Sequence, residues 1–252
     1  MSVALRFILN GLACGLVAAL CFGGPAKAAD PNPAPQRQQI EAIIHDYLMQ
    51  HPDVLIAALR QAEDKLHHDD AAKASKAVAE NRKEVFDDPS TPVAGNPQGD
   101  VAVVEFFDYR CPYCKQVEPS LEAMLKQDPK LRLIYKEFPI LGPVSITAAQ
   151  AALAARRQGK YDTFHAAMME ARGNITDETV YRIAGSVGLD LDKLKHDMAS
   201  PEIAQAIKDN LKLAEALDIH GTPAFVVGDQ VVPGAVELDA LKGMVTDARK
   251  KK

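Results

Sequence analysis

Cysteine is scarce in this chain, and its scarcity narrows the possible chemistry. Four of the 252 residues are cysteine, and only Cys111 and Cys114 lie beyond the first 21 positions. A structural zinc site needs four ligands, usually two cysteine pairs or one cysteine pair with a histidine pair at metal spacing. The seven histidines offer only the adjacent His67 and His68. The sequence therefore argues against structural zinc.

A long uninterrupted apolar run is missing as well. The apolar stretch Phe7–Phe22 is broken by Asn10 and is shorter than the about 20 residues that a membrane-spanning helix needs. Arg6 supplies a positive charge before this stretch, and Ala26–Ala28 forms a small-x-small cleavage site. We interpret residues 1–28 as a cleaved secretory signal peptide.

Positive charge is in short supply too, with a formal net charge of −5 and no basic stripe. Such a chain is a poor candidate for binding nucleic acid. Cleavage after Ala28 would remove Cys14 and Cys21, so that the mature protein keeps one cysteine pair. Export to the periplasm would place this pair in an oxidising compartment, where disulfides form and persist.

Residues 29–68 are predicted to form a helical oligomerisation arm. A proline-rich leader, Asp30–Gln36, precedes a helix that Pro52 ends near His51, and Pro52 begins a second helix. Apolar residues recur at helical spacing in both helices. They are Ile40, Ile43, Ile44, Tyr47 and Leu48 in the first helix and Leu55, Leu59, Ala62 and Leu66 in the second. Such a stripe needs a partner to bury it.

Residues 69–100 are predicted to be a stalk or linker. The stretch up to Asp88 is rich in alanine and charge and has only Val78, Val85 and Phe86 to bury. We therefore expect it to have little reason to pack on the next domain. The following residues, 88–100, contain three prolines and two glycines and are typical of an extended connection with turns.

Residues 101–252 have the pattern of an α/β domain. Val101–Phe107 is almost continuously apolar, as expected of a central strand that is covered on both faces. A helical pattern and a second strand within 131–140 follow, which predicts a parallel strand pair. Helical patterns fill a predicted insertion at about 142–215. Two short strands joined at Gly228 and Asp229 and a closing helix complete the domain.

The pair in "RCPYCK" could be a structural disulfide or a redox catalyst. A disulfide that closes a two-residue loop constrains little of the unfolded chain, so a purely structural role is disfavoured. A cysteine at a helix N-terminus faces unpaired N–H groups that favour the thiolate, the species that attacks disulfides. We assign Cys111 as the exposed nucleophile and Cys114 as the resolving thiol, with Pro112 and Tyr113 tuning the pair.

The stretch "VVEFFDYRCPYC" together with "GTPAF" resembles the thioredoxin-fold proteins of the bacterial Dsb family. The arm "QIEAIIHDYLMQHPDVL" is similar to the N-terminal extension of the suppressor-of-copper-sensitivity type C group and related trimeric proteins. The resemblance implies a thioredoxin fold with a helical insertion, a homotrimer and a protein disulfide isomerase without a cofactor. The implied partners are misfolded proteins and a membrane redox protein, either a DsbD/ScsB-like reductase or a DsbB-like oxidase.

The resemblance also carries roles to individual residues. Pro223 matches the cis-proline beside the active-site disulfide, and the backbone of Thr222 is then expected to pair with an extended substrate chain. Glu105 matches the acid beneath the active site. A lone acid within an apolar strand should be buried with a raised pKa, and we expect it to relay protons for Cys114. His220 either borders the cysteines or is a surface histidine.

Tyr113 departs from the histidine that strongly oxidising family members have at this position, and Thr222 is shared with isomerase-type members. Both residues count against a DsbA-like dithiol oxidase, which remains the first alternative. The preference for an isomerase or reductase rests on the arm, whose apolar stripe is buried most simply by self-association in a symmetric oligomer. The second alternative is a periplasmic copper-tolerance protein in which the two thiolates bind cuprous copper, since thiolates are soft ligands.

Overall fold

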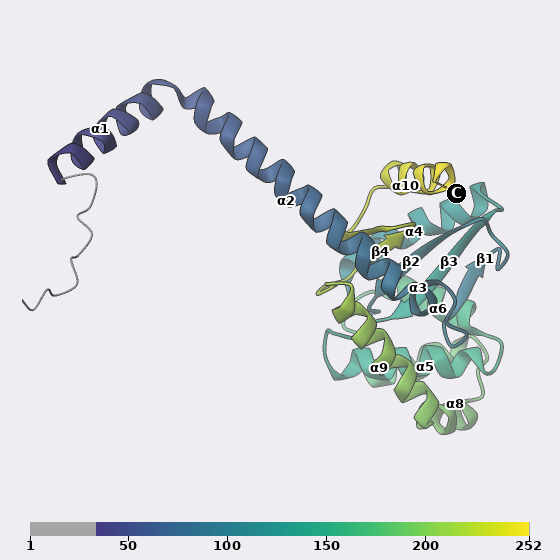
Figure 1. Ribbon diagram of the computed structural model, residues 1–252. Helices are drawn as coiled ribbons and strands as arrows, with labels where there is room; N and C mark the ends of the chain where they lie inside the picture. The colour runs from purple at the N-terminus through teal and green to yellow at the C-terminus, as the bar shows by residue number, and fades with distance from the viewer. Residues whose placement is uncertain (1–33, 252) are drawn as a thin grey trace, which may run out of the picture. The chain divides into compact units, whose positions relative to one another are not determined.

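The computed structural model describes residues 34–251 and divides the chain into two compact units, with the boundary between Arg60 and Gln61 (Figure 1). The predicted signal peptide, with Cys14 and Cys21, and the first part of the predicted leader lie outside the described residues. Within 34–251, no helix combines the length and the apolar character that crossing a membrane requires.

The first unit consists of α1 (Ala34–Gln50) and the beginning of α2 (Pro52–Glu80). Pro52 starts the second helix as predicted, and the first helix ends two residues earlier. Most of the predicted apolar stripe is exposed on the single chain. Its exposed large side chains in this unit are Ile40, Ile43, Ile44, Tyr47, Met49, Val54, Leu55, Ile56 and Leu59. This unit therefore presents an unpartnered apolar surface.

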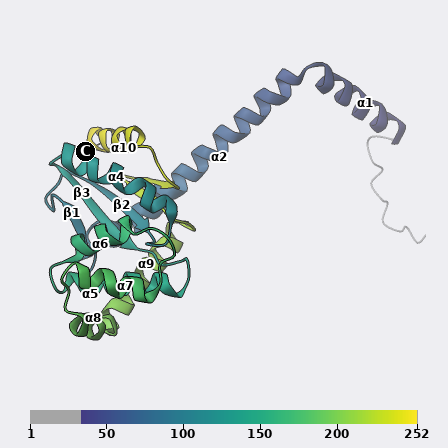
Figure 2. The same ribbon diagram turned by 180° about the vertical axis from the view of Figure 1, so that it is seen from behind.

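The second unit is built on a five-stranded sheet in the order β1-β3-β2-β4-β5. Its strands are β1 (Val93–Gly95), β2 (Val101–Phe107), β3 (Leu131–Glu137), β4 (Ala224–Val227) and β5 (Gln230–Pro233). The strands β2 and β3 run parallel, as predicted, and the other neighbours are antiparallel. The central position of β2 explains its apolar run, because helices cover both faces of the sheet (Figures 1 and 2).

Alternation along the strands separates two apolar cores. Val103 and Phe107 of β2 point into the larger core, which also contains the cysteine pair. Val104 and Phe106 point to the opposite face and pack beneath α3 (Arg82–Phe86) and the end of α9 (Pro201–Ala216). Glu105 therefore faces the larger core, on the side of α4 (Pro112–Gln127) and α10 (Leu238–Lys250).

The helical insertion lies between β3 and β4, as predicted. It consists of α5 (Pro143–Arg156), α6 (Tyr161–Glu170), α7 (Asp177–Ser186), α8 (Leu191–Met198) and α9. Side-chain caps begin two of these helices: Thr176 Oγ1 accepts a hydrogen bond from the Thr179 N–H, and Ser200 Oγ accepts one from the Ile203 N–H. The insertion packs α5 and α6 against the same core that holds the cysteines.

The segment predicted as a free stalk packs on the second unit from Val78 onward, which corrects that expectation. Val78, Val85 and Phe86 are buried against the sheet face opposite the cysteines, and β1 extends the sheet as an edge strand. The expectation was wrong for a physical reason. Three apolar residues are few for a packed segment, but the sequence does not show that one face of the sheet has an apolar surface which this segment can bury.

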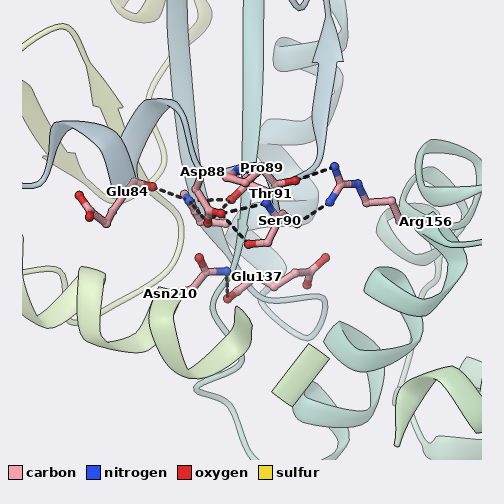
Figure 3. A network of polar contacts seen from close by, with 9 residues as sticks. Glu84, Asp88, Pro89, Ser90, Thr91, Glu137, Arg156 and Asn210 are labelled. Carbon is pink, nitrogen blue, oxygen red and sulfur yellow. Dashed lines mark hydrogen bonds and ion pairs between the residues drawn. The ribbon is translucent and has the colours of Figure 1, made fainter. Parts of the chain in front are cut away.

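Polar contacts hold this segment against the sheet and α5, and Figure 3 draws them around Asp88 and Thr91. The Lys136 side chain is 0% exposed, and its ammonium donates to Glu84 O at 2.7 Å and Thr91 Oγ1 at 2.7 Å and pairs with Asp88 Oδ2 at 3.2 Å. All three N–H donors of the Lys136 ammonium are therefore used, as a buried charge requires. In addition, Arg156 of α5 donates to the carbonyls of Pro89 and Ser90 in the same segment.

Candidate active site at the cysteine pair

Cys111 and Cys114 lie at the N-terminus of α4, directly after β2. Cys111 is the cap residue with an extended backbone, and Pro112 occupies the first helical position, where no backbone hydrogen bond is lost. The Cys111 N–H donates to Asp108 O at 3.0 Å, which fixes the turn into the helix. Both cysteines are free thiols.

The expectation of an exposed nucleophile is wrong, because Cys111 is only 3% exposed and Cys114 is fully buried. Tyr113, between them, is 59% exposed. The Thr222 loop supplies part of the cover over Cys111. A substrate disulfide must therefore reach a recessed sulfur beside an exposed tyrosine.

The Thr222–Pro223 peptide bond is cis, and the chain here lies against the cysteine pair, as predicted. In its protonated form, the Cys111 thiol donates to Thr222 O at 3.2 Å across 111 residues of sequence. Pro223 precedes β4, which pairs with β2, and this pairing holds the loop beside the N-terminus of α4.

The pKa values of the two thiols shift in opposite directions. A hydrogen bond from the Cys114 thiol lowers the pKa of Cys111 to about 6. Burial acts against this shift, whereas hydrogen bonds from the Thr222 side chain and from the N–H groups of Cys114 and Tyr113 add to it. Burial raises the pKa of Cys114, and its hydrogen bond to Cys111 and the charge of Glu105 raise it further. At neutral pH the reduced pair therefore holds a Cys111 thiolate beside a protonated Cys114.

Glu105 is 0% exposed, which confirms the predicted burial. Neither carboxylate oxygen has a hydrogen-bond partner among the described residues. Burial raises its pKa well above the usual range, and the charges of Glu118, Cys111 and Glu137 raise it further. A carboxyl of this kind exchanges a proton at higher pH than an exposed glutamate does.

The sequence reading missed a second set of buried polar residues. Glu118 lies on α4, one turn beyond Cys114, and its Oε1 is 3.4 Å from His165 Nε2. His165 Nδ1 is 3.0 Å from the Tyr109 hydroxyl, which lies 3.2 Å from Glu137 Oε1. The four-residue spacing of Glu118 from Cys114 was a usable signal, whereas His165 carried none because α6 is distant in sequence.

Asp108 is another residue that the sequence reading missed, and it shapes the active-site turn. Its carboxylate accepts hydrogen bonds from the N–H groups of Arg110 at 2.8 Å and of Ile140 and Leu141 at 3.0 Å. Arg110 in turn donates to Leu141 O. The cysteine turn is thus tied to the loop after β3.

Lys115 follows the resolving cysteine directly and links α4 to α6. Its ammonium donates to the carbonyls of Met168 and Met169 at the end of α6. Burial lowers the pKa of Lys115 to about 8, and the charge of Arg172 adds to this effect. Both methionines are buried in the core.

His220 is a surface residue in the described structure. Its Nε2 lies 2.7 Å from Asp218 Oδ1, and both side chains are largely exposed. No described hydrogen bond or ion pair joins it to Cys111 or Cys114. Across residues 34–251, no group of three or more histidine, cysteine, aspartate or glutamate side chains is placed to hold a metal ion.

Two family models match this chain. The model described as DSBA-like thioredoxin domain matches residues 102–246. The model described as copper resistance protein ScsC N-terminal domain matches residues 36–65. The first match covers more than half of the chain, and the second coincides with α1 and the start of α2.

Curated relatives include the Na(+)/H(+) antiporter NhaA 1 of Salinispora arenicola, with 30% identity over 62% of this chain and 24% of the relative. The chain thus spans about a quarter of the length of the first curated relatives that it matches. The thiol:disulfide interchange protein DsbA of Bordetella pertussis is 29% identical over 58% of this chain and 71% of the relative.

Solved structures are similar over longer stretches. A thioredoxin-like oxidoreductase from Silicibacter pomeroyi is 50% identical, with a TM-score of 0.67 over 68% of this chain and 98% of that chain. ScsC of Proteus mirabilis in a transitional conformation is 28% identical, with a TM-score of 0.65 over 87% and 99%. BcfH of Salmonella enterica Typhimurium is 29% identical, with a TM-score of 0.73 over 85% and 96%.

Proposed function

The chain belongs to the DSBA-like thioredoxin domain family and is a thiol-disulfide oxidoreductase of the DsbA/ScsC type, and we propose that it acts as a periplasmic disulfide isomerase or reductase on misfolded proteins. The observation that carries this proposal is the Cys111 thiolate, with its low pKa, next to the protonated Cys114 and the Thr222 carbonyl. Export by the predicted signal peptide, residues 1–28, belongs to the same proposal.

The first step is attack on a wrong disulfide of the client. The Cys111 thiolate forms a bond to one client sulfur, and the other client sulfur leaves as a thiolate that takes up a proton from solvent. In one course, the freed thiol attacks another client disulfide, and the client thiol that this releases attacks the mixed disulfide and displaces Cys111. Cys111 is then released unchanged, and the net reaction is isomerisation without electron transfer to the enzyme.

Resolution by Cys114 makes the reaction a reduction. Cys114 gives its proton to Glu105, its thiolate attacks Cys111 Sγ, and the client sulfur leaves as a thiolate. The enzyme pair ends as a disulfide and has given two electrons to the client. Glu105 suits this role because it faces the same core as Cys114, and its raised pKa makes its carboxylate a stronger base than that of an exposed glutamate.

Client binding is proposed to use the backbone of Thr222. An extended peptide beside the Thr222–Pro223 bond would place its disulfide at Cys111, 3.2 Å from the Thr222 carbonyl. Main-chain pairing gives affinity without demanding one client sequence, which suits an enzyme for varied misfolded proteins.

The arm is proposed to join several copies of the chain, with a trimer preferred. The support is the exposed apolar surface of α1 and early α2 and the match of residues 36–65 to the ScsC N-terminal domain. A closed symmetric oligomer would bury that surface. Several catalytic units in one assembly could hold a client while its disulfides are exchanged.

The direction of electron flow depends on the redox partner. A DsbD/ScsB-like membrane reductase would keep the pair reduced for isomerisation, whereas a DsbB-like oxidase would keep it oxidised. The similarity to DsbA of Bordetella pertussis supports the oxidase as the second candidate.

The copper-tolerance alternative places cuprous copper on the thiolates of Cys111 and Cys114. Titration of the reduced protein with cuprous copper tests it, and Cys111→Ser is the control.

Recovery of scrambled ribonuclease by the full-length reduced protein tests the main proposal. We expect wild type to restore activity and Cys111→Ser to be inactive, while the resting state of the pair in cells is reduced. Cys114→Ser should retain isomerisation by Cys111 but accumulate mixed disulfides. A pair that is fully oxidised in cells, without recovery of scrambled ribonuclease, would favour the oxidase instead.

A further inference from the structure

His165 connects two buried carboxyl groups that lie on either side of it. Its Nε2 faces Glu118 Oε1 at 3.4 Å, and its Nδ1 is 3.0 Å from the Tyr109 hydroxyl. That hydroxyl is also 3.2 Å from Glu137 Oε1, which accepts a second hydrogen bond from Tyr161 at 2.8 Å. We call the row Glu118, His165, Tyr109 and Glu137 the histidine row.

Aromatic rings fix the plane of the His165 imidazole, which is buried. Its ring centroid lies 4.2 Å from that of Tyr135, 5.0 Å from that of Phe107 and 5.7 Å from that of Tyr161, which is stacked on it. The ionisable groups facing the imidazole are Glu118 from α4, Tyr109 from the turn before α4, Tyr135 from β3 and Tyr161 from α6 itself. From α5 and α7, no side chain makes a described hydrogen bond, ion pair or ring contact with it.

The protons of the histidine row can be counted. Tyr109 has one hydroxyl proton but two neighbours, so it donates to only one of Glu137 and His165. If Tyr109 donates to Glu137, its oxygen must accept from His165 Nδ1. If it donates to His165 Nδ1, its oxygen must accept from a protonated Glu137.

Both arrangements hold the same number of protons when His165 Nε2 carries one toward Glu118. In the first, His165 is a cation and Glu137 is a carboxylate. In the second, His165 is neutral and Glu137 is a carboxylic acid. The change from the second to the first moves the Glu137 proton to the Tyr109 oxygen and the Tyr109 proton to His165 Nδ1. Burial raises the pKa of Glu137, which makes the acid form accessible.

The histidine row reaches the cysteine chemistry through Glu118 and Glu105. Glu118 lies one turn beyond Cys114 on α4, and after burial its charge contributes most to the raised pKa of Glu105. Glu105 pairs in register with Tyr135, whose ring contacts His165, so their side chains lie on the same sheet face. A cationic His165 offsets the charge of Glu118, whereas a neutral His165 leaves it uncompensated.

We propose that His165 is a positioning residue that receives a proton from Glu137 through Tyr109 when Glu105 becomes charged. This inference rests on the proposed role of Glu105 as proton acceptor of Cys114. The cation that forms on His165 compensates Glu118, whose charge raises the pKa of Glu105 more than the charge left on Glu137 does. It thereby lowers the cost of a negative charge at Glu105. Removal of the link at Tyr109 keeps His165 neutral and makes Glu105 harder to ionise.

The test is the pH dependence of mixed-disulfide resolution by Cys114 in single-turnover experiments on the full-length protein. Tyr109→Phe removes the link while keeping the ring, and Tyr181→Phe on α7 is the matched control, because it removes a hydroxyl outside the histidine row from a ring that contacts Lys195. We expect the midpoint of the rate profile to rise by about one pH unit in Tyr109→Phe, a tenfold slower rate below the midpoint. Tyr181→Phe should follow wild type.

Two further measurements make the outcome decisive. His165→Gln should shift the midpoint in the same direction as Tyr109→Phe, and it replaces that variant if Tyr109→Phe does not fold. In wild type, the imidazole nitrogen shifts of His165 should change between oxidised and reduced protein. Superimposed profiles of all variants, or unchanged His165 shifts, would overturn the inference. A wild type that does not resolve mixed disulfides at all would instead overturn the proposed resolution by Cys114, and with it the inference that rests on it.

Discussion

Lys136 and Glu137 are consecutive residues of β3 whose side chains leave the sheet on opposite faces. Lys136 binds the segment between α3 and β1 on one face, and Glu137 accepts the hydroxyls of Tyr109 and Tyr161 on the other. The alternation of a strand thus joins the anchor of the N-terminal segment to the buried polar residues behind the cysteines. In Figure 3 the Glu137 backbone also contacts Asn210, which donates to its carbonyl at 3.1 Å.

Lys136→Met should destabilise the protein by about 3 kcal/mol, because the substitution leaves the Asp88 carboxylate, the Glu84 carbonyl and Thr91 Oγ1 without their cation. Denaturant unfolding measures the change. Arg156→Met is the matched control, since it removes a guanidinium that donates to the same loop from an exposed position, and it should cost about 1 kcal/mol or less. Equal losses in both variants would contradict the importance of the buried ammonium.

Glu105→Gln should slow resolution of the mixed disulfide by Cys114 and remove its dependence on pH, because no carboxylate remains to accept the thiol proton. The attack of Cys111 on a disulfide should keep its rate. Stopped-flow measurement of both steps checks this expectation. Glu122→Gln, on the exposed side of α4, is the control and should match wild type. An unchanged resolution profile in Glu105→Gln would rule out the proton relay.

Glu105→Gln should also change how stability depends on pH. The pKa of Glu105 is raised on folding, so the folded state binds more protons and the wild-type free energy of unfolding falls as pH rises above about 4.5. The variant lacks this loss. Its stability relative to wild type should therefore grow with pH, which thermal unfolding at several pH values measures. A constant difference would mean that Glu105 does not titrate in this window.

Cys111 should make the opposite contribution to the stability of the reduced protein. Its pKa falls from about 9 to about 6 on folding, so the unfolded state binds more protons between these values. The stabilisation by Cys111 is therefore full above about pH 9 and is lost as pH falls through 6. The difference in free energy of unfolding between reduced wild type and Cys111→Ser should rise across this window. A flat difference would contradict the low pKa.

Carboxylates introduced on the arm should abolish oligomer assembly without affecting the thiol chemistry of the cysteine pair. Ile43→Glu combined with Leu59→Glu places carboxylates on the exposed apolar surface of the first unit. We expect sedimentation to show an oligomer for wild type and a monomer for the variant, which should oxidise dithiols normally but fail to recover scrambled ribonuclease. Gln38→Glu serves as the surface control. A monomeric wild type would refute the proposed assembly.

The sequence predicted those parts of the site that local patterns encode. The helix start at Pro112, the burial of Glu105 and the cis bond at Pro223 follow from motifs whose geometry is determined within a few residues or by resemblance. Glu118 and His165 meet only because α4 and α6 pack together, and no spacing in the sequence reports that packing.

Two expectations were wrong because they depended on what covers a surface. Residues distant in sequence, including Thr222, help to bury Cys111, so the cysteine motif alone did not predict how exposed its side chain is. Val78 and Phe86 pack because the sheet has a second apolar face without another cover. The apolar composition of a short segment does not show whether such a face is within reach.

The recessed position of Cys111 has a consequence for which disulfides the enzyme leaves alone. A sulfur that is 3% exposed can be reached only by a client strand loose enough to enter the recess beside Tyr113. A disulfide held inside a finished, rigid protein cannot bend toward it, whereas one in a mobile chain can. The enzyme could thus leave correctly folded proteins unchanged without a separate recognition step, because only a flexible client chain can bring its disulfide to the recessed Cys111.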